Sequence, residues 1–134
     1  MVMVKILVVD DAEFFRQLYV AKLTSAGFQV ITAENGREAI AKMEAETPRL
    51  VLMDLVMPEM TGQEALAAIK QNEAIRKIPV VMLTSISADI KGEDLLMEGA
   101  VGYITKDSAT PEEVIAKVEE ILGTSQASLD PKAN

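Results

Sequence analysis

Hydrophobic and polar positions along this chain follow two alternating patterns. Short uninterrupted apolar runs are typical of strands buried on both faces of a sheet. Between them lie segments whose apolar residues recur every three or four positions, as in helices with one buried face. The apolar runs occupy residues 4–9, 28–32, 50–53, 79–83 and 101–105. Five alternations of strand and helix predict an α/β fold, with βαβ units around a parallel sheet.

Three of the five predicted helices are marked by capping-box patterns at their start. In such a box, a polar side chain and a glutamate three residues later satisfy free amide groups of the first turn. The patterns are Asn35–Glu38, Thr61–Glu64 and Thr110–Glu113. The helix over residues 12–26 is instead marked at its end, by Gly27.

The fourth helix is expected to be the least stable. Gly92, near its first turn, costs about 1 kcal/mol relative to alanine. Either Ser87 or Asp89 can cap its start. The apolar residues predicted to face inward from this helix are Ile90, Leu95 and Met97.

Length and composition indicate one globular domain. The chain has 134 residues, 49% of them apolar, which suits a single core. We expect a domain over residues 1–123 and a flexible tail over residues 124–134, where no periodicity is visible. No apolar run approaches the length of a membrane span, and no signal peptide is recognisable. A cytoplasmic protein without disulfides is the simplest interpretation, because cysteine is absent.

Two further features of the composition narrow the chemistry. Histidine is absent, which removes the commonest general base and the commonest transition-metal ligand. The formal net charge of −8 disfavours direct binding to nucleic acid, since such binding depends on cationic contacts to phosphate.

Polar residues that could bind a metal or take part in a reaction follow four of the five predicted strands. Asp10 and Asp11 follow the first, Asp54 the third, Thr84 the fourth and Lys106 the fifth. Ligands of open α/β folds bind at the carboxyl ends of the strands, where these side chains are expected to gather.

This set of side chains is sufficient for phosphoryl transfer. Adjacent carboxylates repel unless a cation intervenes, and Mg²⁺ suits a site of carboxylates, waters and phosphate. Asp54 can act as a nucleophile that forms an acyl phosphate. Lys106 and the Thr84 hydroxyl can contact phosphoryl oxygens, and such chemistry is mostly positioning and charge stabilisation.

Each residue also has a simpler interpretation when taken alone. Asp11 could only cap a helix, and Asp54 could only form a turn. Lys106 could be a solvated lysine, Thr84 a loop residue and Tyr103 a core or edge aromatic. Their joint placement at one edge of one sheet favours the functional interpretation.

Together, these motifs resemble those of a known protein family. The chain resembles the receiver domain of bacterial two-component response regulators, particularly the stand-alone chemotaxis type. The resemblance covers roughly residues 4–122. The motifs that carry it are Val8-Val9-Asp10-Asp11, Asp54-Leu55-Val56-Met57-Pro58-Glu59-Met60-Thr61-Gly62, Leu83-Thr84-Ser85 and Gly102-Tyr103-Ile104-Thr105-Lys106.

The resemblance implies a doubly wound, flavodoxin-like sheet with strand order 2-1-3-4-5 and five helices. It implies that Asp54 is the phosphoacceptor. It also implies that Mg²⁺ is held by Asp11, Asp54 and the Val56 backbone carbonyl, and by Asp10 largely through water. Thr84 and Lys106 would contact the phosphoryl group. Tyr103 would change its burial when Thr84 moves.

Partners follow from the same resemblance. The phosphoryl donor would be a sensor histidine kinase or a phosphotransfer protein. The output surface would be the fourth helix, fifth strand and fifth helix, which would bind a downstream protein. Because no effector domain is visible, we expect output through protein contact. The choice between a motility role and a relay role stays open, as does the choice between a monomer and a phosphorylation-promoted dimer.

Two departures from the family pattern carry predictions. Asp107 follows Lys106 where the family usually has proline, so we expect a trans peptide bond there. Val56 and Ile86, two positions after Asp54 and Thr84, are both apolar and cannot orient an attacking water. We therefore predict a comparatively long-lived phosphorylated state.

The sequence also allows other functions. One is a receiver-like binding module that no longer uses phosphate. A phosphohydrolase with an aspartyl-phosphate intermediate is less favoured, because Val56 stands where such enzymes typically carry a second aspartate. A nucleotide-binding domain is weaker still, because the first strand is not followed by a glycine-rich phosphate loop.

Overall fold

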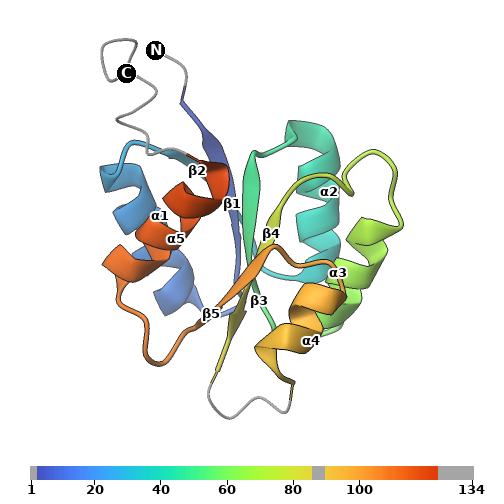
Figure 1. Cartoon of the computed structure of the whole chain (residues 1–134). Coiled ribbons are helices and arrows are strands. Elements are labelled where there is room, and N and C mark those ends of the chain that lie inside the picture. The colour runs from blue at the N-terminus through green and yellow to red at the C-terminus, as the bar shows by residue number, and fades with distance from the viewer. Residues whose placement is uncertain (1–2, 86–89, 124–134) are drawn as a thin grey trace.

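The fold is a five-stranded parallel sheet covered by helices on both faces, as seen in a computed structural model that describes residues 3–85 and 90–123 (Figure 1). The strand order is β2-β1-β3-β4-β5. The strands are β1 (Lys5–Val9), β2 (Gln29–Ala33), β3 (Leu50–Asp54), β4 (Val80–Thr84) and β5 (Gly102–Thr105). The helices are α1 (Glu13–Ser25), α2 (Gly36–Glu46), α3 (Gly62–Lys70), α4 (Gly92–Met97) and α5 (Pro111–Leu122). The predicted doubly wound α/β fold with order 2-1-3-4-5 is confirmed.

The two faces of the sheet carry separate hydrophobic cores. Helices α1 and α5 cover one face, and α2, α3 and α4 cover the other (Figure 1). Successive residues of a strand point to opposite faces, so Val51 packs toward α2 and α3 while Leu52 packs toward α1 and α5. Every residue of β3 is buried, which explains why its sequence is an uninterrupted apolar run.

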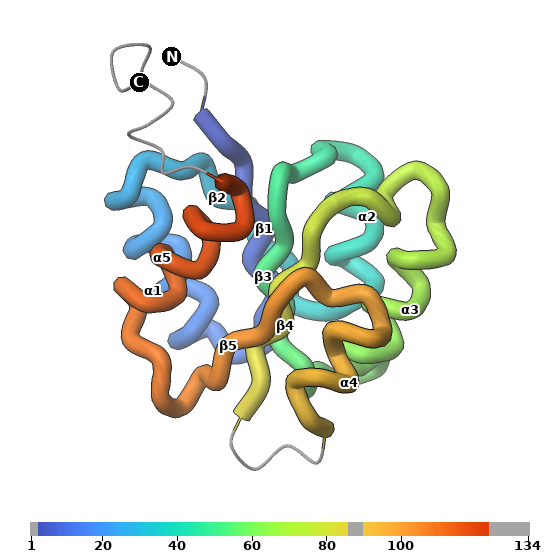
Figure 2. The backbone as a smooth tube through the Cα atoms, in the orientation of Figure 1, coloured from blue at the N-terminus to red at the C-terminus, as the bar shows by residue number. Residues whose placement is uncertain are grey.

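The strand order changes direction at β1: β2 lies on one side of β1, and β3, β4 and β5 lie on the other. Figure 2 follows the tube from blue to red, and β1, the first strand of the chain, lies inside the sheet beside β3. The helices that follow these two strands, α1 and α3, lie on opposite faces. Loops that leave a sheet in opposite directions open a crevice at the carboxyl ends of the two strands.

Helix caps follow the sequence patterns with one difference. Complete capping boxes start α3, with Thr61 and Glu64, and α5, with Thr110 and Glu113. At α2 the Asn35 side chain accepts from the Glu38 amide at 2.8 Å, as predicted. The Glu38 carboxylate, however, accepts from the amide of Glu34 at 2.7 Å instead of from that of Asn35.

The fourth helix differs from its prediction. It has six residues, and its N-cap is Lys91, without a side-chain cap hydrogen bond. The predicted caps Ser87 and Asp89 lie outside the described residues, as does the predicted tail over residues 124–134. Leu95 is buried as expected, but Met97 is 87% exposed, so its inward assignment was wrong. Residues two apart in a helix do not share a face, and the burial of Leu95 therefore turns Met97 outward.

No helix in the described part of the chain has the length and apolar character needed to cross a membrane.

Candidate functional site

The predicted site residues lie at the carboxyl ends of neighbouring strands. Asp54 is the last residue of β3 and Thr84 the last of β4. Asp10 directly follows β1, and Lys106 directly follows β5. The Lys106 amide donates to the Thr84 carbonyl at 2.6 Å, which fixes the end of β5 against the end of β4. The fold thus places residues from four strands along one edge of the sheet.

Three carboxylates meet at this edge. Asp10, Asp11 and Asp54 each offer an oxygen, and these oxygens all lie within 4.8 Å of one another. Asp10 is fully buried, Asp54 is largely buried and Asp11 is exposed. Oxygen ligands of this kind are those that hard divalent cations such as Mg²⁺ prefer. The donor set therefore fits the expected metal.

Asp10 has two structural contacts of its own. Its Oδ1 accepts from the Ala12 amide at 2.9 Å, and its Oδ2 accepts from Lys106 Nζ at 2.7 Å. The N-cap residue of α1 is Ala12, which makes no side-chain cap hydrogen bond. Asp10, and not Asp11, thus orients the chain entering α1, which removes the simpler interpretation of Asp11 as a helix cap.

Lys106 is held inside the site and is not a solvated lysine. Its side chain is only 10% exposed. Besides the bond to Asp10, its Nζ lies 3.4 Å from Asp54 Oδ2 and 4.1 Å from the centroid of the Phe15 ring. The ammonium therefore partly offsets the repulsion between two carboxylates that lie in low dielectric surroundings.

Burial and the nearby carboxylates raise the pKa of two groups at this edge. Burial, and then the charge of Asp10, raise the pKa of the Asp54 carboxyl to about 6. Lys106 and a hydrogen bond from the Val56 backbone act in the opposite direction. Burial, followed by the charges of Asp10 and Asp54, raises the pKa of Tyr19 to about 12. Negative charge thus exceeds positive charge at this edge, which favours a bound cation.

A cavity of about 320 Å³ opens at Asp54. Its lining residues are Asp11, Phe15, Asp54, Val56, Ser85, Lys106 and Asp107. Sequence reasoning did not place Phe15 or Ser85 in this cavity. Phe15 fits the apolar stripe of α1 equally well, and no feature of the sequence marks it as a wall of the site. The Lys106–Asp107 bond is trans as predicted, since the described residues contain no cis peptide bond.

Neither of the two predicted switch residues, Thr84 and Tyr103, lines this cavity. Thr84 is buried, and its hydroxyl donates to the Ser85 carbonyl at 3.1 Å. Tyr103 is partly exposed on β5, and its ring lies over Gly92 at the start of α4. A Cβ atom on Gly92 would lie 2.1 Å from Tyr103 Cζ, so the ring occupies the space that any larger residue there would need.

We predict that Gly92→Ala displaces the Tyr103 ring while leaving the fold intact. A ring at the end of a flexible side chain can rotate away, and alanine favours the helix by up to about 1 kcal/mol over glycine. Tyr103 ring resonances in ¹³C-labelled protein should shift, while those of Tyr19 serve as the internal control. Unchanged Tyr103 resonances, together with a loss of several kcal/mol in stability, would show that the helix had moved instead.

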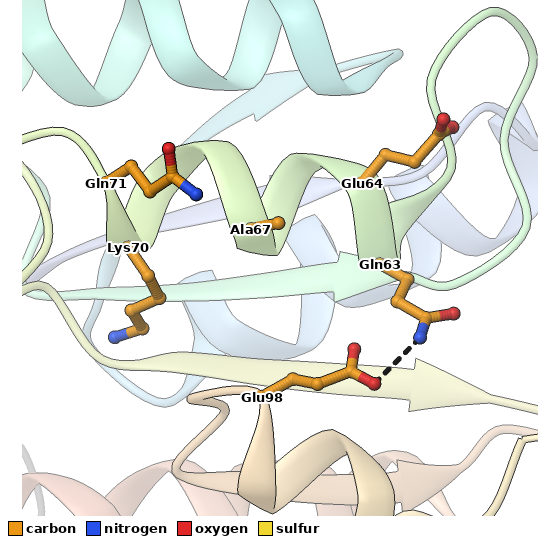
Figure 3. Close-up of a pocket in the computed structure, with 6 residues that line it drawn as sticks. All are labelled: Gln63, Glu64, Ala67, Lys70, Gln71 and Glu98. Atoms are coloured by element: carbon orange, nitrogen blue, oxygen red, sulfur yellow. Dashed lines mark hydrogen bonds between the residues drawn. The ribbon is translucent and has the colours of Figure 1, made fainter.

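A second, separate groove lies between α3 and α4 (Figure 3). It is lined by Gln63, Glu64, Ala67, Lys70, Gln71 and Glu98, and Gln63 Nε2 donates to Glu98 Oε2 across it at 2.8 Å. Burial lowers the pKa of Lys70, whose Nζ donates to the Arg76 carbonyl at 3.0 Å. This groove shares no lining residue with the cavity at Asp54.

Comparisons with known proteins identify several relatives of this chain. The chain is 40% identical to the chemotaxis protein CheY of Bacillus subtilis over 103 residues, covering 76% of this chain and 84% of that protein. It is 38% identical to the alkaline phosphatase synthesis transcriptional regulatory protein PhoP of the same organism, over 91% of this chain but only 50% of PhoP. This chain thus spans about half the length of several curated relatives.

A solved structure has a similar fold. The chemotaxis response regulator CheY4 of Vibrio cholerae superimposes with a TM-score of 0.81 and 32% identity, over 90% of this chain and 99% of CheY4. The sequence profile of the response regulator receiver domain matches residues 6–119, a range that includes all of the strand-end residues described above. The chain belongs to the response regulator receiver domain family of two-component signalling proteins.

Proposed function

We propose that this chain is a cytoplasmic signalling switch in which Asp54 accepts a phosphoryl group from a sensor histidine kinase or a phosphotransfer protein. One observation carries the proposal. The Asp54 carboxylate lies in an open cavity, 3.4 Å from Lys106 Nζ and within a cluster of three carboxylates. A nucleophile, a fixed cation and a metal-binding oxygen set are the parts that phosphoryl transfer needs.

The transfer is a displacement at phosphorus. A carboxylate oxygen of Asp54 attacks the phosphorus of a phosphohistidine, and an O–P bond forms as the N–P bond breaks. The electron pair of the broken bond stays on the imidazole nitrogen of the donor. The product is an aspartyl phosphate, and attack of water on its phosphorus later releases inorganic phosphate and restores the carboxylate.

The residues of this chain have distinct roles in that proposal. Asp11, Asp54 and the Val56 carbonyl would hold Mg²⁺, with Asp10 acting largely through water. Mg²⁺, when bound, neutralises charge that develops on the phosphoryl oxygens. Lys106 Nζ would turn from Asp10 toward a phosphoryl oxygen. The Thr84 hydroxyl would leave the Ser85 carbonyl for another such oxygen.

The output surface in this proposal is formed by α4, β5 and α5. Apolar side chains are exposed in its first two elements and the turn between them, namely Leu96, Met97, Val101 and Tyr103. Solvated apolar residues that gather on one face are typical of a protein interaction site. Phosphorylation would shift a two-state equilibrium of this surface toward the form that binds a downstream protein. Gel filtration with and without a phosphoryl mimic would test whether that form is a dimer.

Intact-mass spectrometry tests the proposed chemistry directly. Incubation with Mg²⁺ and acetyl phosphate should add one phosphoryl group to the wild type, with acetate as the leaving group. The adduct should require Mg²⁺ and be absent in Asp54→Asn. Absence of any adduct, together with absence of Mg²⁺ binding, would contradict the proposal and favour a phosphate-independent binding module.

The lifetime of the aspartyl phosphate should depend on two apolar positions. Val56 is 68% exposed and lines the cavity, whereas Ile86 lies outside the described residues. Replacing Val56 with asparagine and Ile86 with glutamate should accelerate loss of the phosphoryl group, because polar side chains can orient an attacking water. A time course of phosphoprotein mass after donor removal measures the rate. Equal decay of variant and wild type would refute the prediction.

A further inference from the structure

The ring of Phe15 forms part of the wall of the Asp54 cavity. It is half-buried on the first turn of α1, and its centroid lies 4.1 Å from Lys106 Nζ. Its place on the apolar side of α1 accounts for its contact with the core beneath that helix. It does not account for an aromatic face directed at an ammonium group in the site.

Neighbouring side chains hold this ring in place. Tyr19, one turn later in α1, stacks on Phe15 with centroids 6.3 Å apart and planes 27° apart. Phe14 touches the edge of the ring, with centroids 5.4 Å apart, but is itself largely exposed and does not hold the ring. Arg16, on the same turn, donates from Nη1 to the Asp10 carbonyl at 2.9 Å and so ties the start of the helix to the end of β1. The ring is therefore held in place beside the ammonium group of Lys106.

The contacts of Lys106 would change in the proposed phosphoryl transfer. Its ammonium bonds Asp10 at 2.7 Å and is more distant from Asp54, at 3.4 Å. In the proposed function, the ammonium would turn from Asp10 toward an oxygen of a phosphoryl group on Asp54. A lysine is a point charge on a flexible stem, whose position is not fixed by its own geometry. An aromatic face attracts the ammonium without occupying any of its three hydrogens, so the attraction persists while the hydrogen bonds change.

We propose that Phe15 is a positioning residue for phosphoryl transfer, which holds the Lys106 ammonium at the cavity through the negative face of its ring. This proposal rests on the proposed function of Asp54. Low exposure strengthens the contact, because a cation–π pair gains as water is excluded. Without the ring, the ammonium should spend less time at the position that a phosphoryl oxygen would occupy. Phosphorylation should therefore slow.

The test measures the initial rate of adduct formation with acetyl phosphate at saturating Mg²⁺. Phe15→Leu keeps an apolar side chain of similar size without a π face, and should be roughly five- to thirtyfold slower. Site-specific replacement of Phe15 by phenylalanines with one, two and five ring fluorines weakens the π face stepwise while keeping the shape. The logarithm of the rate should fall in the same order. Phe14→Leu, at a 72% exposed position of the same turn, is the matched control and should keep the wild-type rate.

Two further measurements separate positioning from a structural role. In a Lys106→Met background, Phe15→Leu should cause no additional loss, because no ammonium remains to be held. Independently of any phosphorylation, the ε-CH₂ protons of Lys106 should show an upfield ring-current shift that Phe15→Leu abolishes. Rates that do not change across the fluorinated series, or a Phe15→Leu effect that persists without Lys106, would overturn the proposal. If the wild type forms no adduct although the ring-current shift is present, the proposed function of Asp54 fails, and the positioning role that depends on it fails too.

Discussion

Asp54→Asn should stabilise the metal-free protein at pH 8 and leave its stability near pH 4 almost unchanged. Asp54 is buried beside Asp10, and its pKa is raised from 3.8 to about 6 in the folded state. At pH 8 the wild type must therefore keep an unfavourable charge in the fold. Asparagine has nearly the same shape and carries no charge, so the variant avoids that cost.

The sign of the pH dependence follows from the direction of the pKa shift. Between about pH 4 and pH 6, the folded wild type binds more protons at Asp54 than the unfolded chain does. The free energy of unfolding therefore falls as pH rises through this interval, and the full cost is present above it. A shift of about two units corresponds to roughly 3 kcal/mol at most. We expect Asp54→Asn to gain about 1–3 kcal/mol over the wild type at pH 8.

Urea unfolding followed by circular dichroism, in EDTA at one-unit steps from pH 4 to pH 8, measures this difference. Asp94→Asn makes the same chemical change at an exposed position on α4 and serves as the control. Added Mg²⁺ should narrow the gap at pH 8, since the wild type would gain a cation partner for its carboxylates. A difference between Asp54→Asn and wild type that is equal at every pH would show that the buried charge is not its cause.

The fold was predictable because its determinants are local and periodic. The uninterrupted apolar run at β3 reflects burial on both faces, and the boxes at Thr61 and Thr110 are complete in the structure. The burial of Met97 was misjudged, because Met97 lies two positions after the buried Leu95 and residues two apart in a helix do not share a face. In a helix of only six residues, few other apolar positions were available to reveal the error.

The site was predictable only in part. Strand ends indicate which residues approach one edge, and Asp10, Asp11 and Asp54 do meet there. The pattern could not show that Lys106 is buried against Asp10, or that Phe15 lies beside its ammonium. Those contacts depend on how helix α1 packs against the loop after β5. These two segments are far apart in the sequence. The spacing of apolar residues identifies the buried face of a helix, but not which side chain from another segment will contact it.

Gly62→Ala should destabilise the protein by about 3 kcal/mol, a cost typical of severe overpacking. Gly62 is the first residue of α3, and its amide donates to the Leu55 carbonyl at 2.8 Å. The loop after β3 thus folds back closely onto the strand end that carries Asp54. A Cβ atom at Gly62 would lie 2.3 Å from the Asp54 backbone carbonyl oxygen and 2.9 Å from Leu55 Cα. Backbone atoms of a central strand cannot rotate away as a side chain can.

Equilibrium unfolding of Gly62→Ala and Gly92→Ala side by side isolates this cause. Both variants add one methyl group at the first residue of a helix. The new atom meets strand backbone in Gly62→Ala but a movable tyrosine ring in Gly92→Ala. Only Gly62→Ala should lose several kcal/mol and slow the phosphorylation of Asp54, since relief of the clash must displace either α3 or the end of β3. A loss below about 1 kcal/mol in Gly62→Ala would mean that the loop can open without cost. The glycine would then not be what fixes the position of Asp54.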